Sequence, residues 1–106
     1  MNRLDIAPEH LAVVQAVLQK NMPLHTVWAF GSRVKGTAKP YSDLDLAVVG
    51  NTPLSWAELV GLADDFSNSD LPWKVDIVDW ANTSEAFRKI ISAGKIEIQR
   101  SSESNK

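Results

Sequence analysis

The stretch that decides the fold of this chain is Phe30-Gly31-Ser32-Arg33, and ten residues lie between Ser32 and the next motif, Asp43-Leu44-Asp45-Leu46. Side chains of a strand alternate between its faces, so Asp43 and Asp45 are expected to point the same way. Two carboxylates about 6–7 Å apart repel by about 2.5 kcal/mol at an effective dielectric near 20, and a bound cation would offset that repulsion. The Gly31-Ser32 turn offers backbone N–H groups and a hydroxyl to an anion. The stretch therefore predicts a site for a divalent metal and a phosphate.

The hydrophobic pattern around this stretch predicts an α/β (α+β) chain with a small mixed β-sheet backed by helices. Helices are expected at residues 8–21, 33–38, about 56–66 and 82–93. Strands are expected at residues 26–30, 44–49, 74–80 and 96–98. Ser55 and Glu58 have the spacing of a capping box, which marks the start of the third helix.

Composition excludes several classes of protein. The chain has 106 residues, 44% of them apolar and 23% charged, which predicts one globular domain over residues 1–100 with a disordered tail at 101–106. A net charge of −2 argues against nucleic-acid binding. The absence of cysteine excludes disulfides and thiolate zinc sites. No signal peptide or apolar run of ~18 residues is present, so we expect a cytoplasmic protein that does not bind a membrane.

A third carboxylate can join the first two. Asp76 lies between Val75 and Ile77 in the next strand after the Asp43-Asp45 pair, and would stand beside that pair if the two strands are neighbours. Asp79 competes for this role, but regular alternation places it on the opposite face from Asp76. Each acid alone could simply be a solvated side chain. Together, the three predict a cluster suited to Mg²⁺ or Mn²⁺, which prefer oxygen ligands.

These motifs resemble the signature of the DNA polymerase beta-like nucleotidyltransferase superfamily. Phe30-Gly31-Ser32, Asp43-Leu44-Asp45-Leu46 and Val75-Asp76-Ile77 match it in order and spacing, and the run from Phe30 to Ala38 is similar to the minimal nucleotidyltransferase (MNT) branch. The resemblance covers about residues 24–80 and implies the nucleotidyltransferase fold.

The resemblance also implies a role for each site residue. Gly31 and Ser32 would hold the β- and γ-phosphates of a nucleoside triphosphate. Asp43 and Asp45 would bind the divalent metals, Mg²⁺ or Mn²⁺. Asp76 would join the catalytic metal and help to activate an incoming hydroxyl, which attacks the α-phosphate as pyrophosphate leaves. Arg33 is a further candidate for the triphosphate because its planar fork matches phosphate oxygens, although Arg33 and Lys35 could equally be surface charges.

The acceptor is expected on another molecule, because the catalytic core takes up almost the whole chain. The chain is similar to the antitoxin half of HEPN–MNT pairs, in which the transferase binds a helical HEPN toxin and moves AMP from ATP to a tyrosine on it. This resemblance implies a type VII-like antitoxin with ATP as substrate and a hetero-oligomeric complex. Two alternatives stay open: a non-catalytic antitoxin that masks its partner, and a transferase for a small hydroxylated molecule such as an aminoglycoside.

The tryptophans are a further candidate for contact with ligands. Trp56, Trp73 and Trp80 fall near the ends of expected elements, where an indole can be half exposed. Each is interpreted first as a packing residue; the alternatives are that one or more stacks on a nucleobase or forms part of a partner interface, where tryptophan is enriched.

Overall fold

The computed structural model describes residues 4–101 and contains the expected elements in the expected order. The helices are α1 (Pro8–Asn21), α2 (Ser32–Lys35), α3 (Trp56–Ser67) and α4 (Glu85–Ala93). The strands are β1 (Thr26–Phe30), β2 (Leu44–Val49), β3 (Val75–Asp79) and β4 (Ile96–Gln99). The predicted tail at 101–106 lies, apart from Ser101, outside the described residues. No helix within residues 4–101 has the length and apolar character of a transmembrane segment.

Two element boundaries differ from the prediction by more than one residue. Helix α2 ends at Lys35 instead of residue 38, because Gly36 adopts a left-handed conformation with φ 80° and ψ 17° and closes the helix. Helix α4 begins at Glu85 instead of residue 82, because Trp80–Asn82 form a short 3₁₀ turn and the Ser84 side chain caps the new helix. The predicted capping box of α3 is confirmed: the side chains of Ser55 and Glu58 each accept a hydrogen bond from the other residue's backbone N–H.

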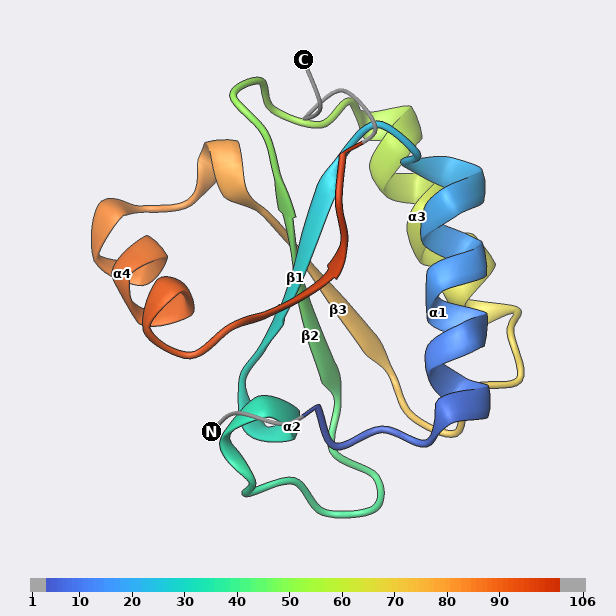
Figure 1. Ribbon diagram of the computed structural model, residues 1–106. Coiled ribbons are helices and arrows are strands. Elements are labelled where there is room, and N and C mark those ends of the chain that lie inside the picture. The colour runs from blue at the N-terminus through green and yellow to red at the C-terminus, as the bar shows by residue number, and fades with distance from the viewer. Residues whose placement is uncertain (1–3, 102–106) are drawn as a thin grey trace.

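The four strands form one mixed sheet in the order β3-β2-β1-β4. Strand β1 pairs antiparallel with both β2 and β4, and β2 pairs parallel with β3. A parallel pair needs a long crossover between its strands, and α3 supplies it. Helices α1 and α3 cover one face of the sheet, and α4 lies beyond the other (Figure 1). Strands β3 and β4 are the edges of the sheet.

Two apolar clusters fix which face each strand residue points to. The larger cluster joins α1 and α3 to alternate strand residues, including Val27, Leu44 and Leu46, which are at most 1% exposed. The smaller cluster lies toward α4 and contains Phe30, Ala47 and Ile91. Burying one leucine contributes roughly 1.5–3 kcal/mol, so a one-residue slip that exposed the buried side of β2 would be costly. This register turns the odd-numbered residues of β2, Asp45 among them, toward the α4 side.

Candidate active site

The sheet brings the three predicted carboxylates to one place. Asp45 and Asp76 are direct neighbours in the parallel pairing of β2 and β3, and neighbouring strands lie about 4.8 Å apart. Asp43 lies just before β2, and its carboxylate is near enough to that of Asp76 to raise the pKa of Asp76. The site therefore stands at the start of β2 and β3, next to the point where antiparallel β1 ends.

Electrostatics at this cluster disfavour the charged forms of two of its members. Burial raises the pKa of Asp45, and the nearby charges of Asp76 and Asp43 raise it further. Burial also raises the pKa of Asp76, and the hydrogen bond and charge of Asp43 add to the effect, while Lys74 opposes it. A bound cation would offset the repulsion between these carboxylates, because a nearby opposite charge favours their ionised forms.

Three carboxylates supply the hard oxygen donors that Mg²⁺ or Mn²⁺ takes, so the donor chemistry fits the expected metal. Within residues 4–101, no three His, Cys, Asp or Glu side chains already form a metal-binding cluster. The fit therefore rests on the chemistry of Asp43, Asp45 and Asp76 and on the raised pKa values of the last two.

Gly31 connects β1 to α2 and lies directly against this cluster. Its backbone has φ 80° and ψ −154°, a region that only glycine occupies readily. A Cβ atom at this position would overlap the carboxylate of Asp45. Gly31 therefore serves two purposes: it turns the chain into α2, and it lets the backbone approach the carboxylate. Ser32 follows as the first residue of α2, beside the same turn.

A cavity of about 300 Å³ lies between the sheet and α4 at this turn. Gly31, Lys35 and Asp45 line its polar part. Its apolar part is formed by Phe30, Val78, Phe87 and Ile90. Lys35 could not be told from a surface charge in the sequence, but here it borders the same cavity as the turn and a carboxylate. A lysine followed by a glycine at a helix end does not by itself indicate a binding role, so only the structure identifies Lys35 as a candidate.

Arg33 lies elsewhere than expected. The residue is only 5% exposed, and the three nitrogens of its guanidinium donate to the backbone carbonyls of Ser42, Asp5 and Pro40 at 3.0, 2.9 and 3.2 Å. It also lies 4.6 Å from the centre of the Trp73 ring. These contacts occupy the fork that was expected to hold phosphate. In this arrangement Arg33 is a positioning residue, because it holds the carbonyl of the residue directly before Asp43.

Asp79 is also kept out of the cluster. Its carboxylate accepts hydrogen bonds from the Leu54 backbone N–H and the Asn82 side chain, both at 3.0 Å. Asp79 thereby ties the end of β3 to the segment that leads into α3.

Comparisons with known proteins identify a matching family and a similar sequence. The family model described as "Polymerase beta, Nucleotidyltransferase" matches residues 13–103. A protein of Haemophilus influenzae named "Probable protein adenylyltransferase MntA" is 56% identical over 97 residues, which cover 92% of this chain and 85% of that protein.

Solved structures share the fold at lower sequence identity. A toxin–antitoxin crystal structure with AMP-PNP matches with a TM-score of 0.72 at 24% identity, over 88% of this chain and 75% of that one. A structure of tri-AMPylated Shewanella oneidensis HEPN toxin in complex with MNT antitoxin matches with a TM-score of 0.66 at 22% identity, over 88% and 71%. At this identity the likeness concerns the fold alone, and it confirms the predicted nucleotidyltransferase fold.

Proposed function

This chain belongs to the polymerase beta nucleotidyltransferase family, and we propose that it transfers AMP from ATP to a tyrosine hydroxyl of a partner HEPN toxin. The observation that carries the proposal is the gathering of Asp43, Asp45 and Asp76 beside the Gly31 turn. Carboxylates next to an anion-binding turn suit the transfer of a charged phosphoryl group, whose catalysis is mainly positioning and charge stabilisation.

In the proposed reaction, the Gly31-Ser32 turn binds the β- and γ-phosphates of ATP, and Lys35 lies within the same cavity to balance their charge. Asp43, Asp45 and Asp76 would hold Mg²⁺ or Mn²⁺, which when bound stabilises the negative charge on the attacking and leaving oxygens. The acceptor oxygen forms a bond to the α-phosphorus, the bond to pyrophosphate breaks, and Asp76 is placed to receive the hydroxyl proton.

A protein acceptor is supported by the relatives. The protein that is 56% identical over most of both chains is named a probable protein adenylyltransferase. Among structures of the same fold, one pairs an MNT antitoxin with an AMPylated HEPN toxin. We therefore assign the acceptor to a HEPN-type partner in preference to a small molecule.

The test is to incubate the purified chain with its co-encoded partner, ATP and Mg²⁺, and to measure the intact mass of the partner. The expected result is a gain of one or more AMP units, which peptide mapping places on tyrosine. An Asp43→Asn variant is the matched control, because it keeps the shape of the side chain and removes its charge; it should give no gain.

Two outcomes would contradict the proposal. If the partner gains no mass, but both the unsubstituted chain and the Asp43→Asn variant still inhibit its toxin activity, the chain masks its partner instead of modifying it. If AMP appears only on an added aminoglycoside, the acceptor is a small molecule.

A further inference from the structure

The start of strand β3 carries one residue of the carboxylate cluster at a place where strands open easily. Strand β3 is an edge strand, so its backbone pairs with β2 alone. Asp76 is the second residue of β3, and the ends of an edge strand are where local opening costs least. Opening of this end would carry Asp76 away from Asp45, its partner in the pairing of the two strands. A stable cluster therefore requires an anchor near the start of β3.

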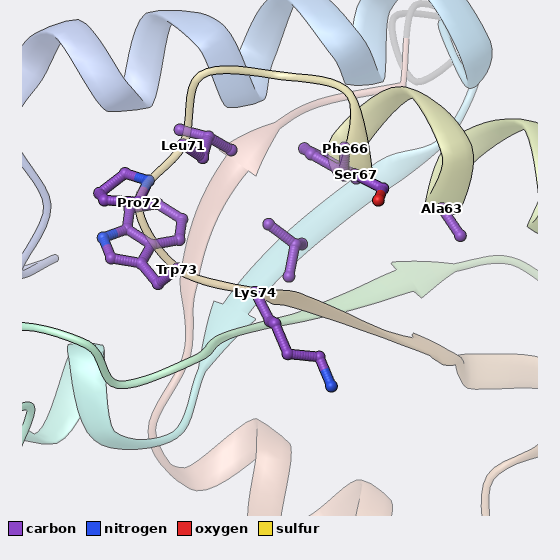
Figure 2. A pocket seen from close by; sticks show the side chains of 8 residues that line it. Ala63, Phe66, Ser67, Leu71, Pro72, Trp73 and Lys74 are labelled. Carbon is purple, nitrogen blue, oxygen red and sulfur yellow. The ribbon is translucent and has the colours of Figure 1, made fainter.

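Packing against α3 is incomplete where β3 begins. The segment that leads into the strand borders a cavity of about 450 Å³. Figure 2 shows Leu71, Pro72 and Trp73 on one side of this space and Phe66 and Ser67 on the other. Packing stabilises a segment only where atoms touch, so the α3 side contributes little at this point.

Trp73 makes its defined ring contacts with α1 and α2. The guanidinium of Arg33, on α2, lies over the indole, with its Cζ 4.6 Å from the ring centre. The ring of His10, on α1, meets the indole edge to face, with the ring centres 5.8 Å apart and the planes at 85°. Both arrangements are favourable for an indole. Two helices thus hold a residue that comes just before β3.

Arg33 is a firm support because its guanidinium is already fixed. The residue is buried, and its three nitrogens donate to backbone carbonyls, one of which belongs to Ser42, directly before Asp43. Arg33 also follows the Gly31-Ser32 turn directly. These hydrogen bonds do not involve Trp73, so they keep the turn and Asp43 in place when the indole is removed.

The backbone transmits the position of Trp73 to Asp76. Lys74 follows Trp73, and its carbonyl accepts a hydrogen bond of 2.9 Å from the Leu44 N–H. This bond lies at the start of the pairing between β2 and β3, close to the pair formed by Asp45 and Asp76. A shift of Trp73 would therefore disturb the pairing that holds Asp76.

We propose that Trp73 is a positioning residue: its stack on Arg33 fixes the start of β3 and thereby holds Asp76 within the carboxylate cluster. The inference deepens the proposed function and rests on it for the kinetic test, whereas the placement of β3 is measured without turnover. Trp73 acts through the strand and is assigned no contact with ATP or with the acceptor.

The first test measures local opening by amide hydrogen exchange in the chain alone. The Leu44 amide, which donates to Lys74, reports the pairing at the start of β3, and the amides of the central strand β1 correct for any global loss of stability. Relative to those amides, we expect Leu44 to exchange at least about tenfold faster in Trp73→Leu than in the unsubstituted chain. Trp73→Phe should stay within about threefold of the unsubstituted chain, because a phenyl ring still offers a face to the guanidinium.

Trp80→Leu is the matched control for this test. Trp80 also carries an arginine, with the Cζ of Arg88 5.1 Å from its ring, but it lies just after the other end of β3. Its loss should leave the relative exchange of Leu44 unchanged. Equal acceleration in both leucine variants, or none in Trp73→Leu, would overturn the inference.

The unsubstituted chain provides a measurement that does not depend on the folding of any variant. An anchored start of β3 predicts that the Leu44 amide is protected to within about tenfold of the β1 amides. Exchange of Leu44 on the timescale of an open chain end would show that nothing holds this end of β3, and would also overturn the inference.

The second test separates kcat from KM in the AMP-transfer assay, at a temperature where each variant is folded. Displacement of Asp76 should lower kcat, whereas the Gly31-Ser32 turn keeps its place. We therefore expect kcat of Trp73→Leu to fall at least about tenfold, with the KM for ATP within about twofold of the unsubstituted chain. Trp73→Phe should restore most of kcat, and Trp80→Leu should leave it unchanged.

Two kinetic results would contradict the role of Trp73. One is a rise in the KM for ATP with kcat unchanged, and the other is an equal fall in kcat for Trp73→Leu and Trp80→Leu. An unsubstituted chain that never modifies its partner would instead refute the proposed function and leave the hydrogen-exchange result standing, so the two failures are distinguishable.

Discussion

Two glycines with the same φ angle allow a test of how much the close approach of Gly31 to Asp45 contributes to stability and activity. Gly31 and Gly36 both have φ 80°. At Gly36 a Cβ atom would meet nothing within 4 Å, whereas at Gly31 it would overlap the carboxylate of Asp45. Substitution of either glycine by alanine introduces backbone strain, but only Gly31→Ala also displaces a site residue. Gly36→Ala is therefore the matched control.

The expected losses of stability and activity follow from the backbone strain at each glycine and from the overlap with Asp45 at Gly31 alone. An alanine in the left-handed region costs about 1 kcal/mol, which is the whole cost expected for Gly36→Ala. Gly31 has ψ −154°, where a non-glycine residue costs up to about 3 kcal/mol, and the movement of Asp45 adds to that. We expect Gly31→Ala to lower the free energy of unfolding by about 3 kcal/mol or more. A displacement of about 1 Å at a reacting centre can lower the rate 100-fold, so we expect about that loss in kcat.

Urea denaturation and steady-state AMP transfer measure these effects, and a double variant isolates the overlap. In an Asp45→Ala background the carboxylate is gone, so adding Gly31→Ala should cost only the backbone strain. Equal stability and activity of Gly31→Ala and Gly36→Ala would refute the reasoning. So would a cost of Gly31→Ala that is the same with and without the Asp45 carboxylate, because the overlap would then contribute nothing.

Two further predictions concern the charges around the site. The folded pKa of Asp45 is raised by burial, then by Asp76 and Asp43, so its ionisation destabilises the fold as pH rises through that pKa. Asp45→Asn should therefore raise the free energy of unfolding by about 1 kcal/mol at pH 7 in a chelating buffer, measured by urea denaturation. The gain should vanish below the unfolded value of 3.8, and a gain that persists there would contradict the repulsion. Arg33→Lys should cost about 3 kcal/mol of stability, because lysine cannot serve three carbonyls, and should leave the Kd for ATP unchanged when measured by calorimetry. An unchanged stability with weaker ATP binding would instead restore Arg33 as a phosphate ligand.

The local residue pattern was enough to predict the helices and strands and the clustering of Asp43, Asp45 and Asp76. The β-branched run at Thr26–Phe30 and the alternation in Leu44–Val49 predicted strands that the structure confirms. Asp76 could be placed beside the Asp43-Asp45 pair on the condition that the two strands are neighbours, and the structure pairs Asp76 with Asp45. The boundary of α4 was wrong because a 3₁₀ turn over Trp80–Asn82 precedes it, and such turns leave little trace in hydrophobic periodicity.

Long-range contacts account for what the sequence could not predict. The role of Arg33 depends on three carbonyls from Asp5, Pro40 and Ser42, which come together only when the chain before α1 packs against the loop before β2. Trp56 was interpreted first as a packing residue but is 81% exposed, and how α3 lies on the sheet is not encoded in any one segment. Both features follow from the assembled sheet.

The most direct test of the central claim compares ATP labelled at the α-phosphate with ATP labelled at the γ-phosphate, each incubated with the chain, Mg²⁺ and the co-encoded partner. Transfer of AMP predicts that only the α-label reaches a tyrosine of the partner, that chelation of Mg²⁺ abolishes it, and that Asp43→Asn prevents it. Label from the γ-phosphate on the partner, or α-label transferred equally by Asp43→Asn, would contradict the account.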